Sequence, residues 1–149
     1  MSSRVLRSLS SLSFLIAALA VAGCSSSDSP DPGDNAAVIA KGADLVKTNG
    51  CASCHSSDNK DEVLSGQDTP ISPKEYGANL TPDKETGLGS WTDAQVADAI
   101  TKGVDDEGEM LCSTMQRYSS FSEDDVAAIV AYLRSIPAVK HAVTESECP

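Results

Sequence analysis

The stretch Cys51-Ala52-Ser53-Cys54-His55 decides the fold of this chain. Two thiols three positions apart, followed at once by an imidazole, form the attachment signature of a c-type haem. Each thiol can add to one vinyl group on the same edge of a porphyrin, and the next residue then places a ring nitrogen beneath the iron. We therefore predict one covalent haem c, bound through Cys51 and Cys54, with His55 as an axial ligand of the iron.

Two other kinds of site also use a Cys-x-x-Cys pair. A structural zinc ion requires four Cys or His ligands, and the sequence contains no second paired cluster. A thioredoxin-like thiol pair requires a βαβ setting, and the alternation typical of strands is absent. Both alternatives rank below covalent haem, the more so because the chain begins with an export signal.

Residues 1–23 have the pattern of a cleaved lipoprotein signal peptide. Arg4 and Arg7 precede the apolar stretch 12–21, which is too short to remain as a membrane span. The segment Val21-Ala22-Gly23-Cys24 follows, which resembles the bacterial lipobox, where the thiol is acylated and the chain is cut immediately before it. Cys24 would then be the lipidated N-terminus, anchored without a transmembrane helix. The alternative is a plain secretory signal with Cys24 as a bystander.

Residues 24–35 are expected to form a flexible tether, because they are rich in Ser, Asp, Pro and Gly. Residues 36–149 have the size of one domain. The signal and the tether together place this domain in the bacterial cell envelope, lipid-anchored on the periplasmic side of a membrane.

The domain has an all-α pattern. Thr92 and Gln95 form a capping box, and Gly50 follows an amphipathic segment directly before the haem motif. Residues 56–89 contain several prolines and no sustained period, which predicts an ordered, irregular connection that wraps around something. Helices are expected over 36–48, from Thr92 to Gly103, and from Ser122 to Pro137.

The cysteine count assigns a partner to each remaining thiol. With Cys24 used for lipid and two cysteines for haem, Cys112 and Cys148 are left. In an oxidising compartment this pair is expected to form a disulfide rather than two free thiols. Such a bond would pin the C-terminal tail beside the segment that carries a candidate iron ligand.

Several stretches outside the haem motif are distinctive, above all Asn79-Leu80-Thr81-Pro82 and Trp91-Thr92. With them the chain resembles the small class I c-type cytochromes, including the cytochrome domains associated with bacterial membrane dehydrogenases. The resemblance covers the stretches 50–55, 76–83, 86–89, 91–92, 103–104, 111–118 and 121–137. It implies an all-α cytochrome c fold, with three or more helices around one covalent haem. Gly42 and Tyr132 match positions where the first and last helices of this family cross closely.

The resemblance also implies the ligands of the iron. His55 carries over as the proximal ligand. Met115 carries over as the distal ligand, because the methionine of the family follows a leucine by a few residues and precedes an aromatic residue, here Tyr118. Thr114 and Gln116 stand where family members often have proline.

Other distal ligands remain possible from the sequence. Met110 is the rival of Met115, and a vacant or otherwise ligated site is a further alternative. His141 lies beyond the last helix, where we expect an exposed side chain. Asn79, Tyr76 and Trp91 have polar groups that either bind a haem propionate or serve packing and loop structure. The side chains expected to line the haem pocket or its neighbouring core are Tyr76, Leu80, Trp91, Leu111, Tyr118 and Phe121.

The charge of the chain bears on its partners. The formal net charge is −11, and loss of Arg4 and Arg7 with the signal changes it to −13. This balance excludes nucleic acid as a partner. It favours a redox partner with a basic docking surface, found by electrostatic steering. Solubility alone would also explain an acidic surface.

These expectations define a function. With both axial positions filled, the chain is expected to be a membrane-tethered carrier of single electrons between respiratory or dehydrogenase partners, and not an enzyme. One alternative is a haem enzyme or gas sensor with a labile distal ligand. A thiol oxidoreductase without haem is the other.

Overall fold

The computed structural model describes residues 32–57 and 63–148. The expected signal peptide and Cys24 lie outside these residues. The described elements, in chain order, are α1 (Pro32–Thr48), α2 (Ala52–His55), the short 3-10 helix η1 (Leu88–Ser90), α3 (Asp93–Thr101) and α4 (Glu123–Ser135). Only two isolated β-bridges accompany them in this part of the chain. The all-α prediction is therefore confirmed, and none of the described helices is long and apolar enough to cross a membrane.

Helix α1 begins four residues before the expected start at Ala36. Pro32 suits the first helical turn because its φ is already helical, and Asp34 interacts favourably with the positive end of the helix dipole. Residues 32–35, which we expected in the flexible tether, are thus helical.

The end of α1 delivers the chain to the haem motif. Gly50 has a φ of +68°, the left-handed conformation that glycine adopts without strain. Its N–H donates to Lys47 O at 3.1 Å, and the N–H of Cys51 donates to Val46 O at 3.2 Å. This pair of bonds is a Schellman cap. It turns the backbone sharply, so that the two cysteines follow directly after the helix.

The starts of α3 and α4 confirm the expected caps. The Thr92 hydroxyl accepts from Gln95 N while the Gln95 side chain accepts from Thr92 N, which completes a capping box. Ser122 and Asp125 form the same arrangement before α4. Each box satisfies two backbone donors that a helix start would otherwise leave unpaired.

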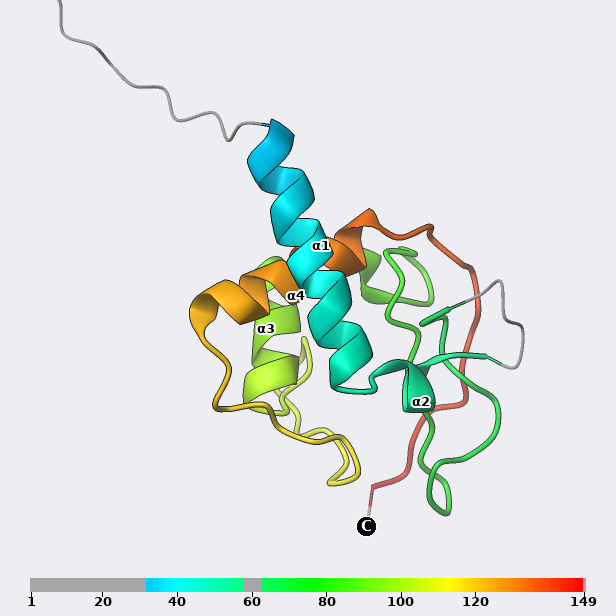
Figure 1. The fold of residues 1–149 in the computed structure, drawn as a ribbon. Coiled ribbons are helices and arrows are strands. Elements are labelled where there is room, and N and C mark those ends of the chain that lie inside the picture. Colours follow the sequence, from blue (N-terminus) through cyan, green and yellow to red (C-terminus); the bar gives the residue numbers. More distant parts are fainter. Residues whose placement is uncertain (1–31, 58–62, 149) are drawn as a thin grey trace, which may run out of the picture.

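Helices α1 and α4 cross in close contact, as Figure 1 shows. A Cβ atom added to Gly42 would lie 1.9 Å from Ala128 O and 2.8 Å from the Cβ of Tyr132. Lys41 and Asp125 form an ion pair across the same crossing at 2.8 Å. The expected pairing of a glycine with an aromatic residue is therefore confirmed. The buried core around this crossing consists of Val46, Leu64, Leu88, Val96, Ile100, Val126, Ile129, Val130 and Leu133.

After α4 the chain turns back over the long irregular connection (Figure 1). We call residues 137–148 the C-terminal strap. Val139 N donates to Thr81 Oγ1 at 3.1 Å, and the side chain of Asn79 donates to Val139 O at 2.8 Å. Further along, Glu147 N donates to Lys74 O at 2.8 Å. The strap therefore holds the connection in place over most of its length.

Gly42→Ala tests the helix crossing. Alanine normally stabilises a helix interior relative to glycine by about 0.5–1 kcal/mol. Here we expect the opposite sign, a loss of about 1–3 kcal/mol, because the added methyl group overlaps the backbone of α4. Urea unfolding followed by circular dichroism measures the change. Lys47→Ala, at an exposed position of α1, is the control. Unchanged or increased stability of Gly42→Ala would contradict the close crossing.

Candidate functional site

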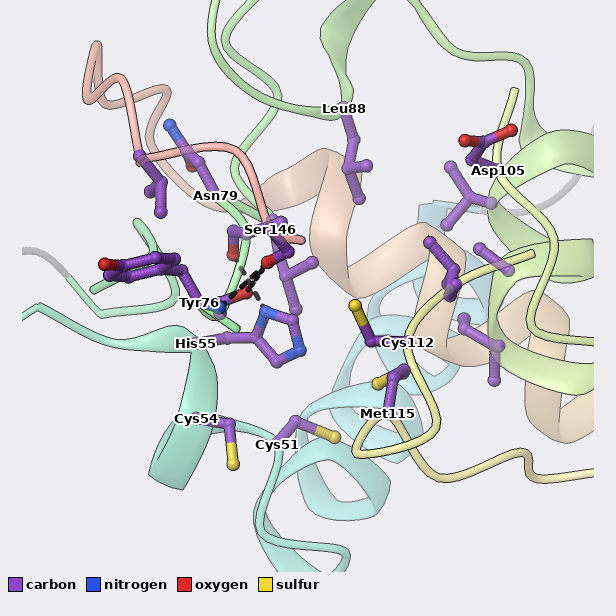
Figure 2. A pocket seen from close by; sticks show the side chains of 18 of the residues that line it. Cys51, Cys54, His55, Tyr76, Asn79, Leu88, Asp105, Cys112, Met115 and Ser146 are labelled. Atoms are coloured by element: carbon purple, nitrogen blue, oxygen red, sulfur yellow. Dashed lines mark hydrogen bonds between the residues drawn. The ribbon is translucent and has the colours of Figure 1, made fainter. Parts of the chain in front are cut away.

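A cavity of about 880 Å³ lies between the haem motif, the irregular connection and the loop that leads to α4. The haem motif lines this cavity with Cys51, Cys54 and His55. The 110–118 loop lines it with Met110 and Met115. Figure 2 shows these segments around the pocket. The aromatic and leucine side chains expected there all line the cavity: Tyr76, Leu80, Trp91, Leu111, Tyr118 and Phe121.

Cys51 is the N-cap of α2 and Cys54 lies within this short helix, and both thiols are free. Both are half-buried, and burial raises the pKa of the Cys51 thiol. The residues described by the structure contain no group of three or more Cys, His, Asp or Glu side chains that could hold a metal ion.

Gly77 packs directly against this motif. A Cβ atom at Gly77 would lie 1.6 Å from Cys54 O and 3.3 Å from His55 Cα. No side chain larger than hydrogen fits this contact without moving the backbone. The irregular connection is thereby held against the haem motif at this point.

The imidazole of His55 is oriented by the next residue of the connection. Its Nδ1 lies 2.8 Å from Ala78 O, and because a carbonyl oxygen only accepts, Nδ1 carries the proton. The lone pair of Nε2 is therefore free to bind a metal. Desolvation lowers the pKa of His55 below its ordinary value, although the bond to Ala78 acts in the opposite direction. Because desolvation is the larger effect, the net lowering of the pKa favours a neutral ring, in which Nε2 is the available nitrogen.

The 110–118 loop brings a thioether to the same cavity. Met115 is half-buried, whereas Met110 is 54% exposed. Met115 N donates to Cys112 O at 3.0 Å, and Tyr118 N donates to Ile100 O at 2.9 Å, which attaches the loop to α3. The Tyr118 ring stacks on Phe121, with centroids 5.0 Å apart. The loop is thus fixed at both sides of Met115.

A disulfide joins Cys112 to Cys148, with Cα atoms 5.0 Å apart. It connects the C-terminal strap to the loop that carries Met115. Tyr76 N donates to Ser146 Oγ at 2.8 Å, a bond drawn as a dashed line in Figure 2. The strap therefore contacts the haem-motif side of the cavity and is covalently attached to the methionine side.

The expectation of an exposed His141 is wrong. Its side chain is only 20% exposed. Its Nδ1 lies 2.9 Å from Ser65 O, and its Nε2 lies 3.2 Å from the Asp68 carboxylate. Because the strap folds back over the connection, both ring nitrogens have partners within the protein. His141 serves to attach the strap.

Asn79 has a structural role. It is 2% exposed, its Nδ2 donates to Val139 O at 2.8 Å, and its Oδ1 accepts from Thr81 N at 2.9 Å. These bonds organise the connection and the strap, and they use both ends of the amide. Of the two interpretations left open for Asn79, the structure supports loop structure.

Two features of the site were not found from the sequence. The carbonyl of Ala78 orients His55, and Glu75 is a buried acidic residue that lines the cavity. A backbone carbonyl has no residue signature. An acidic residue in an irregular loop resembles any surface residue, so no signal in one sequence would have identified Glu75.

The residues of this cavity fit a covalently bound haem. Two free thiols adjoin an imidazole with an available Nε2, and a methionine from a distant loop lines the same mainly apolar space. This combination of donors suits c-type haem attachment with His/Met ligation.

Comparison with known proteins agrees with this fit. The family model of cytochrome c matches residues 39–137. The chain is 31% identical over 120 residues to the gluconate 2-dehydrogenase cytochrome c subunit of Pantoea cypripedii, which covers 77% of this chain and 27% of that subunit. It is 31% identical over 117 residues to the cytochrome c subunit of the quinone alcohol dehydrogenase of Gluconacetobacter polyoxogenes. The matched residues make up 75% of this chain and 24% of that subunit.

A third relative is the fructose dehydrogenase cytochrome subunit of Gluconobacter japonicus, 30% identical over 99 residues, which cover 64% of this chain and 20% of that subunit. The matched region spans about a quarter of the length of the first of these relatives. The fold and the site define a c-type haem protein. The chain belongs to the cytochrome c family, whose members hold haem c covalently.

Removing the disulfide tests the role of the strap. The bond closes a loop of 36 residues, so Cys112→Ser/Cys148→Ser should lose about 3–4 kcal/mol of stability on the chain-entropy model. Urea unfolding of the oxidised protein and the variant measures the difference. Ser113→Ala, at an exposed position of the same loop, is the control. Equal stability, or alkylation of both thiols in unreduced wild-type protein, would contradict the covalent attachment.

Proposed function

We propose that this chain is a membrane-tethered, single-haem cytochrome c that carries single electrons between respiratory or dehydrogenase partners. The observation that supports this best is the shared cavity, which brings the Cys51–His55 motif and Met115 together from segments 60 residues apart. The sequence contains one Cys-x-x-Cys-His motif, which supports one haem per chain.

In this proposal, Cys51 and Cys54 would provide the thioether links, and His55 Nε2 and the Met115 sulfur would hold the iron. Met115 is preferred to Met110 because it is half-buried in a loop fixed at both sides, whereas Met110 is mostly exposed. When bound, haem supplies a ferric/ferrous couple for single electrons. With both side chains bound to the iron, no ligand position would remain for oxygen or peroxide. The protein then acts as a carrier rather than an enzyme.

The tether is the second part of the proposal. Lipidation at Cys24, after cleavage of residues 1–23, would hold the domain on the periplasmic side of a membrane. The relatives named above are subunits of dehydrogenases, which supports a redox enzyme as donor or acceptor. The tether would keep the domain within reach of such a partner.

The acidic surface supports a partner with a basic docking face. The mature chain would carry a net charge of −13. Around the cavity, Glu85, Asp105 and Glu145 add acidic side chains to its lining. A positive partner would be attracted to this side over about a Debye length, about 10 Å at 0.1 M salt.

Met115→Ala tests the ligand set. The ferric wild-type protein should show the weak charge-transfer absorption of an iron–thioether bond, and Met115→Ala should lose it. The reduced variant should also bind carbon monoxide at neutral pH, since the iron would then lack its methionine ligand. Met110→Ala is the matched control and should keep the band.

Two results would contradict this assignment. Loss of the band in Met110→Ala instead would transfer the ligand role to Met110. Carbon monoxide binding by the reduced wild-type protein would favour a sensor or enzyme with a labile ligand.

The salt dependence of electron transfer tests the docking surface. Oxidation of the reduced protein by the cation tris(1,10-phenanthroline)cobalt(III) should slow as ionic strength rises from about 0.01 to 0.1 M, because screening weakens the attraction. Oxidation by the anion ferricyanide should accelerate over the same range. Stopped-flow absorbance measures both rates, and rates independent of salt with both reagents would refute electrostatic steering.

A further inference from the structure

Glu75 stands apart among the buried polar residues of the described chain. The others are Ser65, Asn79 and Thr81, which are neutral, whereas Glu75 is acidic and only 4% exposed. No ion pair joins it to a lysine, arginine or histidine in the part of the chain that the structure describes. Burying a carboxylate without an ion pair costs free energy. The position of Glu75 in the wall of the cavity therefore suggests a function for this side chain.

The Glu75 side chain contacts the 110–118 loop, which carries Met115. The hydroxyl of Thr114 donates a hydrogen bond to Glu75 Oε2. Thr114 directly precedes Met115, so this bond fixes the backbone beside the proposed distal ligand. It connects residues 39 positions apart in the sequence.

The backbone of Glu75 is fixed as well. Ile71 N donates to Glu75 O at 2.8 Å, and Glu75 N donates to Ser72 O at 3.0 Å. Three residues later, Ala78 O accepts from His55 Nδ1. The segment 75–78 therefore contacts His55 on one side and the residue before Met115 on the other.

We propose that Glu75 is a positioning residue that holds Met115 in place through Thr114 and lowers the reduction potential of the haem through its buried negative charge. The inference rests on the proposed His/Met haem site. Ferric iron carries one more positive charge than ferrous iron, so a nearby carboxylate stabilises the ferric form. Burial reduces the screening of this interaction by water.

Two substitutions separate the hydrogen bond from the charge. Glu75→Gln keeps an acceptor for the Thr114 hydroxyl and removes the charge. We expect a higher midpoint potential with an unchanged iron–thioether band. Thr114→Val keeps the charge and removes the hydrogen bond. Imidazole should then displace the thioether from the ferric protein about tenfold more readily, because a hydrogen bond to a charged group is lost.

Glu145→Gln is the matched control. Glu145 also lines the cavity, but its side chain is exposed. Water screens its charge, so its removal should change the potential much less than Glu75→Gln does. Glu75→Asp provides a second variant should Glu75→Gln fail to mature. It should keep the low potential and bind imidazole more readily, because the shorter side chain no longer reaches Thr114.

Potentiometric titration and imidazole titration at neutral pH decide the proposal. It is overturned if Glu75→Gln and Glu145→Gln have the same potential as wild-type protein, or if Thr114→Val binds imidazole with wild-type affinity. A wild-type protein without haem, or without the iron–thioether band, would instead refute the proposed function on which the inference rests.

Discussion

The contact between the haem motif and Gly77-Ala78 is the constraint on which the rest of the site depends. A Cβ atom at Gly77 would overlap Cys54 O, and Ala78 O receives the Nδ1 proton of His55 at 2.8 Å. The first interaction holds the irregular connection against α2, and the second selects the tautomer with a free Nε2. The connection must then pass around the cavity rather than through it, which leaves the space that a haem would fill.

The other side of the cavity is held by long-range bonds rather than by local structure. The 110–118 loop has no helix of its own, yet it is fixed by the disulfide from Cys112, the backbone bond from Tyr118 to α3 and the hydrogen bond from Thr114 to Glu75. In the proposed site, the Met115 thioether would be a weak iron ligand, so its position has to come from its surroundings. The C-terminal strap supplies part of this support, because it joins the connection to the loop.

Features set by neighbouring residues could be predicted from the sequence, and features set by distant contacts could not. The capping boxes at Thr92 and Ser122, and the helix end at Gly50, depend on residues within one turn. The predicted start of α1 at residue 36 is four residues too late, because a segment rich in Pro and Gly is also typical of a linker. The burial of His141 and Glu75 depends on partners 39 or more positions away, which no local pattern encodes. The haem motif itself could be predicted from the sequence, because haem attachment requires one fixed spacing of the two cysteines and the histidine.

The central claim is that a haem is covalently attached to Cys51 and Cys54 within this cavity. Intact mass spectrometry of the denatured mature protein, made in a host competent in cytochrome maturation, tests it most directly. We expect a mass increased by one haem that persists after acid–organic extraction and disappears in Cys51→Ala/Cys54→Ala. A colourless protein with the mass of the polypeptide alone, or a haem removed by extraction, would contradict it.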